Sequence, residues 1–190
     1  ITSAQSVAFG NSTGAGLTIN AGSVVFSGNG AFTVAAVGNI NVNPGATLAI
    51  DETSAAILNR LANSAVTLNG SSFTYTGNAA GSSEVSTGAL VMSVGASTLT
   101  SYTAGGSNLI TFSALTLNAD TSFTLAGTSD IGTATNKITF TTAPTLTPAT
   151  TGILARGITG ANFDFVTYGA NGLANYTAYN ATGGSSTNIN

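Results

Sequence analysis

The residues Leu17-Thr18-Ile19-Asn20 open a pattern that decides the fold, because it returns three times along the chain. The other copies are Ile40-Asn41-Val42-Asn43, Val66-Thr67-Leu68-Asn69 and Leu115-Thr116-Leu117-Asn118. Apolar and polar side chains alternate in each copy, which is the period of a β-strand with one buried face. A second alternating run follows each copy after a short turn. The pattern therefore predicts pairs of short strands joined at a tight corner.

Weaker copies fill the gaps and give the chain a period. They begin at Leu90, Ile138 and Phe163, so that all copies begin at residues 17, 40, 66, 90, 115, 138 and 163. Successive starts differ by 23, 26, 24, 25, 23 and 25 residues. A period of about 24 residues is typical of solenoids, in which each repeat stacks on its neighbours. We expect the starts from 17 to 138 to form one inward-facing column.

A third apolar cluster late in most periods, such as Ile110 with Phe112, gives each period three short strands. We therefore predict an all-β fold, a right-handed parallel β-helix (β-solenoid) of about seven coils of about 24 residues. It would form a single domain over residues 1–190. The first coil would be incomplete at 1–16, the regular coils would span 17–162, and an aromatic-rich coil would span 163–190.

The asparagines that end the four clear copies, Asn20, Asn43, Asn69 and Asn118, are predicted to turn the chain at a coil corner. Asn tolerates the left-handed backbone conformation and bonds to neighbouring backbone. If these residues stack, their amides can form a ladder between coils. The alternative is four unrelated hairpin turns in an antiparallel sandwich. Asn-Gly hairpin signals are scarce, which favours the solenoid.

Residues 51–61 break the pattern. Acids come first, at Asp51 and Glu52, a base follows at Arg60, and the apolar residues have helical spacing. Two interpretations stay open, a single helical turn that bulges from a coil and an irregular corner. Glu84, the one acid in a near-neutral stretch, is expected to bond to exposed backbone at a corner or to act as a contact residue.

Charge is scarce, since only 5% of the residues are Asp, Glu, Lys or Arg. A net charge of −3 offers no basic surface for nucleic acid and no polybasic patch for a membrane. No apolar run is long enough for a membrane span. The chain has no Cys and no His, and its acids are scattered, so we expect no catalytic, metal or cofactor site and no enzyme. So few charges also predict a stability that depends weakly on salt and pH.

A set of ordered motifs runs from Leu58 to Thr100 and through the C-terminal part. The motifs are Asn59-Arg60-Leu61, Ala65-Val66-Thr67-Leu68-Asn69-Gly70, Gly77-Asn78, Ser82-Ser83-Glu84, Gly88-Ala89-Leu90, Gly95-Ala96-Ser97-Thr98-Leu99, Asn136-Lys137-Ile138, Pro144-Thr145-Leu146, Gly152-Ile153-Leu154 and Asn162-Phe163-Asp164-Phe165-Val166-Thr167-Tyr168. In this order they resemble a known family, the autotransporter-associated β-strand repeat proteins. The resemblance covers roughly residues 15–180. It implies a large, repetitive, exported surface protein with a β-helical passenger, and it supplies no catalytic residues.

These observations favour a structural segment of an extracellular or cell-surface fibre, exported in the Gram-negative manner. The chain begins at Ile1 rather than Met, so we expect a processed product or a segment of a longer protein. Neither end shows a cap, and head-to-tail stacking with itself, or tandem repetition, is the expected partnership. The residues expected to carry that contact are Ile1, Val7, Phe9 and Ile189.

The alternative function is an adhesin passenger that binds surface glycans or another surface. Its support is an aromatic cluster near the C-terminus, since aromatic faces bind sugars. The cluster consists of Phe163, Phe165, Tyr168, Tyr176 and Tyr179. The same residues could instead plug the last coil.

Overall fold

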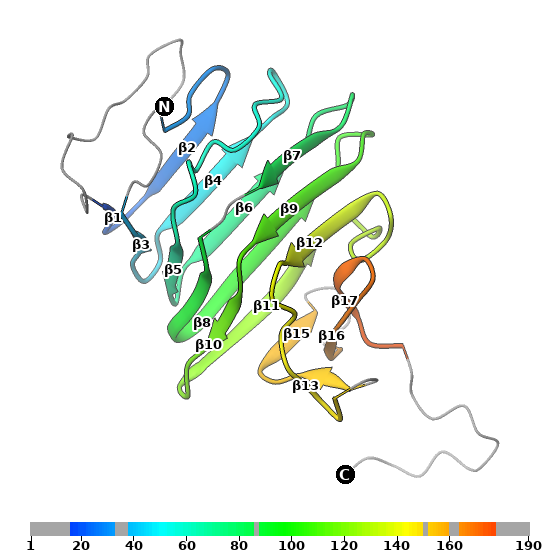
Figure 1. Ribbon diagram of the computed structural model, residues 1–190. Coiled ribbons are helices and arrows are strands. Elements are labelled where there is room, and N and C mark those ends of the chain that lie inside the picture. Colours follow the sequence, from blue (N-terminus) through cyan, green and yellow to red (C-terminus); the bar gives the residue numbers. More distant parts are fainter. Residues whose placement is uncertain (1–15, 33–37, 86–87, 150–151, 160–163, 178–190) are drawn as a thin grey trace.

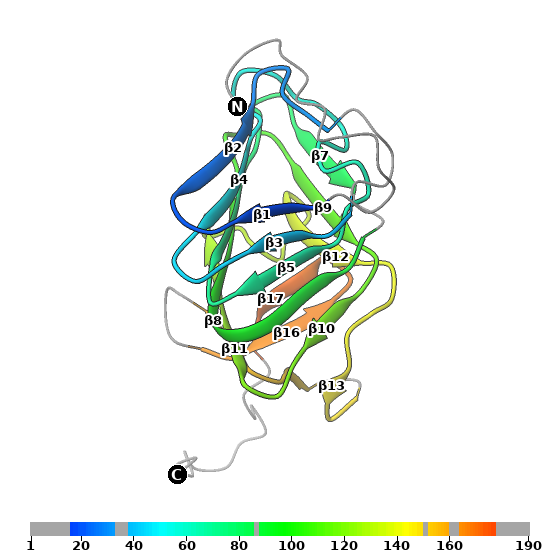
Figure 2. The same ribbon diagram turned by 90° about the vertical axis from the view of Figure 1, so that its left-hand side faces the viewer.

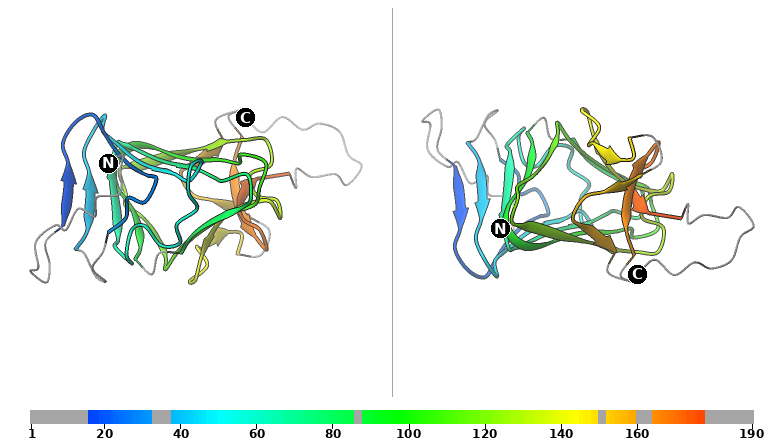
Figure 3. Two further views of the ribbon diagram at one scale, coloured as in Figure 1. Left: turned by 90° about the horizontal axis from the view of Figure 1, so that it is seen from above. Right: turned by 90° about the horizontal axis from the view of Figure 1, so that it is seen from below.

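The structure, a computed structural model, describes residues 16–32, 38–85, 88–149, 152–159 and 164–177. These residues form an all-β parallel solenoid of about four turns and contain no helix. Figure 1 shows the strands stacked side by side, and Figure 3 shows the N-terminal coil and the C-terminal strands at opposite ends. The predicted β-solenoid is confirmed, whereas the prediction of about seven coils is not. The described residues include no helix that could span a membrane.

The first face of the solenoid holds the strands that the repeat pattern predicted. They are β1 (Leu17–Ile19), β3 (Ile40–Val42), β5 (Val66–Asn69), the first part of β8 (Leu90–Tyr102) and β10 (Leu115–Leu117). Figure 2 looks onto this face. Leu17 pairs with Ile40, and the column continues through Val66 and Leu90 to Leu115 in parallel register. The column from 17 to 115 is therefore confirmed.

The second face carries the run that follows each corner. Its strands are β2 (Ser23–Ser27), β4 (Thr47–Asp51), β6 (Ser72–Thr76), the second part of β8, β11 (Thr121–Gly127) and β15 (Gly157–Thr159). The inward positions form apolar columns, for example Leu48, Phe73 and Leu99, which are 0% exposed. Because β8 continues through the corner at Gly95, it joins the first and second faces into one sheet.

The third face is shorter. It consists of β7 (Ser82–Val85), β9 (Asn108–Phe112), β12 (Asn136–Phe140), β17 (Gly172–Asn175) and β16 (Val166–Gly169). The coil between β4 and β5 contributes no strand to it, because residues 52–65 run through bends and turns. Of the two interpretations of residues 51–61, the irregular corner is therefore the correct one.

The prediction that Ile138 begins a sixth first-face strand is wrong. Ile138 pairs with Ile110 on the third face, within the register of β12 and β9. The connection that precedes β12, residues 128–135, is longer than the corresponding connection before β9, residues 103–107. The coil that begins at Leu115 is therefore longer than those before it. Counting 23 residues on from Leu115 ends at Ile138, in the third strand of the same coil, and not at the start of a new coil. Phe163, the seventh predicted start, lies outside the described residues.

The C-terminal end of the solenoid is closed by antiparallel strands. Phe165 forms an antiparallel bridge to Ile158 of β15, β16 pairs antiparallel with β17, and β17 extends the third face beside β12. Val166 and Leu173 from this hairpin are 0% exposed. Two further short strands, β13 (Leu146–Thr147) and β14 (Ile153–Leu154), form another antiparallel pair nearby. The stretch on which the sequence interpretation found no cap at this end, residues 185–190, lies outside the described residues.

Candidate functional site

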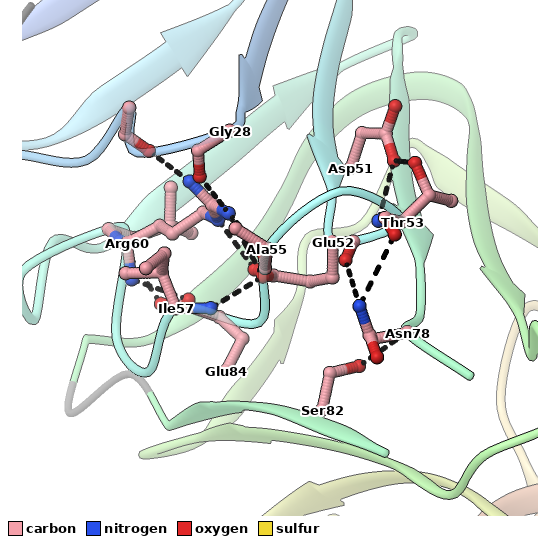
Figure 4. A network of polar contacts seen from close by, with 12 residues as sticks. Gly28, Asp51, Glu52, Thr53, Ala55, Ile57, Arg60, Asn78, Ser82 and Glu84 are labelled. Atoms are coloured by element: carbon pink, nitrogen blue, oxygen red, sulfur yellow. Dashed lines mark hydrogen bonds and ion pairs between the residues drawn. The ribbon is translucent and has the colours of Figure 1, made fainter. Parts of the chain in front are cut away.

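Three charged side chains lie completely inside the solenoid, although the chain has only 6 acids and 3 bases. Glu52, Arg60 and Glu84 are each 0% exposed. Arg60 belongs to the irregular residues 53–64, called here the linking segment, which connect β4 to β5. Asn59, Ala62 and Asn63 in this segment have positive φ angles of 63°, 46° and 65°, so the backbone cannot continue as a strand. Figure 4 shows the network that these side chains form.

The guanidinium group of Arg60 binds one carboxylate and three carbonyl oxygens. Its Nε donates to Glu52 Oε1 over 2.6 Å, and its Nη2 donates to Glu52 Oε2 over 3.0 Å. The Nη2 group also donates to the carbonyl oxygens of Gly28, at 2.8 Å, and Ala55, at 2.7 Å. The Nη1 group donates to the carbonyl oxygen of Gly30. Because Gly28 and Gly30 belong to the preceding coil, Arg60 ties the linking segment to that coil.

Glu84 reaches the same segment from the following coil, on β7. Its Oε2 accepts the backbone N–H of Arg60 at 2.6 Å, and its Oε1 accepts the backbone N–H of Leu61 at 3.0 Å. On the other side, the backbone N–H of Phe32 donates to the carbonyl oxygen of Arg60 over 2.8 Å. Side chains and loop backbone therefore make the contacts between coils that a β-ladder makes elsewhere.

The network contains two carboxyl groups and one cation, and that cation, Arg60, is already paired with Glu52. Glu84 contacts no cation within hydrogen-bond distance and relies on two backbone donors. Burial raises the pKa of Glu84 to about 7, the two backbone hydrogen bonds oppose the shift, and the nearby Glu52 carboxylate adds to it. Burial also raises the pKa of Tyr75, on β6, well above its usual range, and the same two glutamates add to that shift.

A second buried network lies at the corner before the third face, and it is almost uncharged. Asn108 and Asn136, 1% and 0% exposed, begin β9 and β12 and occupy one register column. Asn136 Nδ2 donates to Thr128 Oγ1 over 3.0 Å, and Ser101 Oγ donates to Asn136 Oδ1 over 2.6 Å. Asp130 stands at its edge. Burial alone would raise the pKa of Asp130, but hydrogen bonds from Thr128, Thr135 and Asn136 outweigh burial and lower it.

Three of the four predicted corner asparagines form a ladder. Asn43 Nδ2 donates to Asn20 Oδ1 over 2.7 Å, and Asn69 Nδ2 donates to Asn43 Oδ1 over 3.2 Å. Asn118 follows a coil that has Ser93 in the corresponding place, and it donates to the Ser93 carbonyl oxygen over 3.3 Å. None of the four has a positive φ.

The left-handed conformation that was expected of these asparagines belongs to the corner glycines. Gly22, Gly45, Gly70 and Gly95 have φ angles of 72°, 76°, 67° and 73°. The asparagines therefore act through their side-chain amides, while the glycines supply the backbone turn.

The predicted aromatic face is divided. Phe165 is 43% exposed, and Tyr176 is half-buried. Tyr168 ends an aromatic column through the core, with ring-centroid distances of 5.8 Å from Phe73 to Phe112, 6.1 Å to Phe140 and 5.8 Å to Tyr168. The hydroxyl group of Tyr168 accepts the Phe140 N–H at 2.9 Å and donates to the Phe140 carbonyl oxygen at 3.1 Å. Tyr168 thus closes the edge of β12.

Several predicted residues cannot be placed. Phe163 and Tyr179 of the aromatic cluster lie outside the described residues, as do the four predicted assembly residues Ile1, Val7, Phe9 and Ile189. The described part of the chain contains no group of three or more Asp and Glu side chains placed to hold a metal ion.

The expectation that Glu84 bonds to backbone at a corner is confirmed by its contacts with the Arg60 and Leu61 N–H groups, although these groups are buried rather than exposed. Sequence reasoning missed the rest of both buried networks, although each left a signal. Glu84 follows Arg60 by 24 residues, which is one period of the repeat, so the period predicts that the two positions stack in neighbouring coils. Asn108-Leu109-Ile110-Thr111-Phe112 and Asn136-Lys137-Ile138-Thr139-Phe140 are identical at every position except the second. This repeat marks a third-face strand and would have corrected the assignment of Ile138.

Comparisons of this chain with protein-family models, curated proteins and solved structures returned no match.

Proposed function

We propose that this chain is a structural segment of an extracellular or cell-surface fibre, related to the autotransporter-associated β-strand repeat proteins that its sequence resembles. One observation carries the proposal. Strands stack in parallel register from β1 to β10 on one face and from β2 to β15 on the next, so that each coil is a repeat unit of a rod. A rod of this kind is long and stiff, as a fibre or stalk has to be.

The distribution of charge supports the same function. Glu52, Arg60 and Glu84 are buried where they bond neighbouring coils, while the outer strand faces carry Thr, Ser and Asn. We further propose a right-handed winding, because crossover connections between parallel strands are right-handed in about 98% of cases.

End-to-end stacking remains part of the proposal, and the C-terminal hairpin defines part of the contact that it requires. On the third face a second copy would pack against β16 and the Phe165 side chain, because β17 already pairs with β12. On the first face β10 pairs, among the described residues, with β8 alone, so its other edge could extend the parallel ladder.

The test is electron microscopy of the native assembly together with the intact mass of its dissociated chains. Fibres that dissociate into chains near 18.5 kDa would support stacking of small subunits. Fibres made of a much larger chain would support a tandem segment. A compact particle that remains monomeric at high concentration, with no longer covalent form, would overturn the fibre function.

Glycan binding is the second candidate, and the exposure of Phe165 favours it. Phe165, 43% exposed, lies beside Ile158, 37% exposed, at the closed end. Together they offer an apolar surface of the kind on which sugar rings stack. Binding of the full chain to a polysaccharide panel, lost in Phe165→Ala with an unchanged circular dichroism spectrum, would favour this function.

A further inference from the structure

The linking segment is held in the solenoid by two opposed contacts. Towards the preceding coil, Arg60 bonds to the Gly28 and Gly30 carbonyl oxygens. Towards the following coil, both carboxylate oxygens of Glu84 accept backbone N–H groups of the segment. No strand of the segment pairs with β7, so Glu84 replaces the missing ladder between these two coils.

At the contact between Glu84 and the segment the buried charges do not balance. The groups that face Glu84 are Glu52 from the end of β4, Arg60 from the segment itself and Tyr75 from β6. Arg60 is paired with Glu52, whose carboxylate also accepts the Ile57 N–H at 2.7 Å. An ionised Glu84 therefore leaves one net negative charge in a volume from which water is excluded.

We propose that the linking segment is a pH-responsive element, in which the protonation state of Glu84 sets how firmly the segment is held to the coils on either side. Opening of the segment would expose Glu84 to water, where its carboxyl group ionises readily. The closed segment holds a proton that the open segment releases, so a rise in pH favours opening. This inference does not depend on the proposed fibre function.

The direction and the range of the effect follow from the two states. The pKa of Glu84 is about 7 in the closed segment, against 4.5 for an exposed Glu. The closed state is therefore favoured most below pH 4.5, loses its advantage as the pH rises towards 7, and changes little above that. In the steep part of this range, the equilibrium for opening shifts about tenfold per pH unit.

Glu52 and Glu84 are the only two glutamates of the chain, which makes a direct measurement practical. With glutamate labelled at the carboxyl carbon, the NMR spectrum of the folded chain contains two side-chain signals. We expect one of them to titrate with a midpoint near pH 7 and to be absent from Glu84→Gln. If both signals titrate below about pH 5.5, the inference is wrong.

Hydrogen exchange of the Arg60 and Leu61 amides, corrected for the intrinsic rate, tests the consequence. In the unmodified chain we expect their protection to fall about fortyfold between pH 5 and 7. Glu84→Gln should remove this dependence, and Asp120→Asn, at an exposed acid, should leave it unchanged. If protection in the unmodified chain is equal at pH 5 and pH 7, Glu84 does not control the segment, whatever its pKa. The NMR titration and the exchange measurement on the unmodified chain need no variant, so together they decide the proposal even if Glu84→Gln does not fold.

Discussion

The third face of the solenoid is built in two ways, and the two halves differ in how neighbouring coils are joined. From β7 to β12 the backbone forms a parallel ladder, and the buried polar side chains of β9 and β12 are uncharged, with Asn108 and Asn136 at equivalent positions. In the coil before β7 the ladder is missing. Glu52, Arg60 and Glu84 stand in its place, all of them fully buried.

This difference shows what a missing strand costs inside a solenoid. Buried backbone groups need partners, and a regular strand finds them on the next strand. The linking segment instead presents carbonyl and N–H groups in directions that no neighbouring strand can meet. A guanidinium group, with five donors in a fixed fork, and a carboxylate, with two acceptor oxygens, can meet several such groups at once. Ionic side chains are therefore used where the backbone is irregular.

The largest effect is expected from Arg60→Met, which removes the cation from the irregular half. Glu52 would be left buried without its partner, and the carbonyl oxygens of Gly28 and Ala55 would each lose a donor. We expect the free energy of unfolding to fall by about 3–5 kcal/mol, as when one partner of a buried ion pair is removed. Chemical denaturation measures this value. Arg156→Met, the same change at an exposed arginine, is the control and should cost less than about 0.5 kcal/mol. Equal losses in the two variants would mean that the buried pair does not hold the segment.

The second prediction concerns global stability and pH. The pKa of Glu84 is raised from 4.5 to about 7 in the folded chain, so its contribution to stability is complete below pH 4.5 and lost as the pH rises through 7. A shift of this size corresponds to roughly 3 kcal/mol. We expect the midpoint of urea denaturation to fall between pH 5 and 8 in the unmodified chain and to stay nearly constant in Glu84→Gln. A rising midpoint over this range would show that the sign is wrong. The range also lies above that in which Asp130, whose pKa is lowered, takes up its proton.

The sequence predicted the regular part of this fold and not the irregular part, for a physical reason. The alternation and the period depend on which side chains face inward. From Leu17 to Leu115 the inward positions are apolar, so both can be seen in the sequence. The position of Arg60 inside the core depends on the backbone carbonyl oxygens of Gly28 and Gly30, about 30 residues away. Because every residue has a backbone carbonyl group, the residue types at these positions do not reveal the contact. Scarce charge predicted a weak dependence on pH, yet one buried carboxyl group is enough to change that expectation. The weak dependence on salt stays a prediction, because salt screens buried charges little.

The neutral half of the third face is expected to respond less than the ionic half. Asn136→Ala would remove one hydrogen-bond partner from Ser101 Oγ and one from Thr128 Oγ1 inside the corner network. We expect a loss of about 2 kcal/mol, within the range for a buried polar group that loses its hydrogen-bond partner. The measurement is again chemical denaturation, with Asn41→Ala on the outer side of β3 as the control. A loss as large as that of Arg60→Met would contradict the distinction between the two halves.

The smallest effect is expected at the Asn20, Asn43 and Asn69 ladder, which lies at the surface of the first corner. Its two amide bonds, of 2.7 and 3.2 Å, compete with water, so each contributes little net free energy. We expect Asn43→Ala to cost about 1 kcal/mol or less, since it breaks both bonds but leaves no group buried without a partner. Asn41→Ala, two residues earlier, should cost less still. A double-mutant cycle of Asn43→Ala and Asn69→Ala isolates the bond between them, and we expect a coupling free energy of about 0.5 kcal/mol. A coupling of zero would mean that the amides stack without stabilising the coils, and that the glycines alone determine this corner.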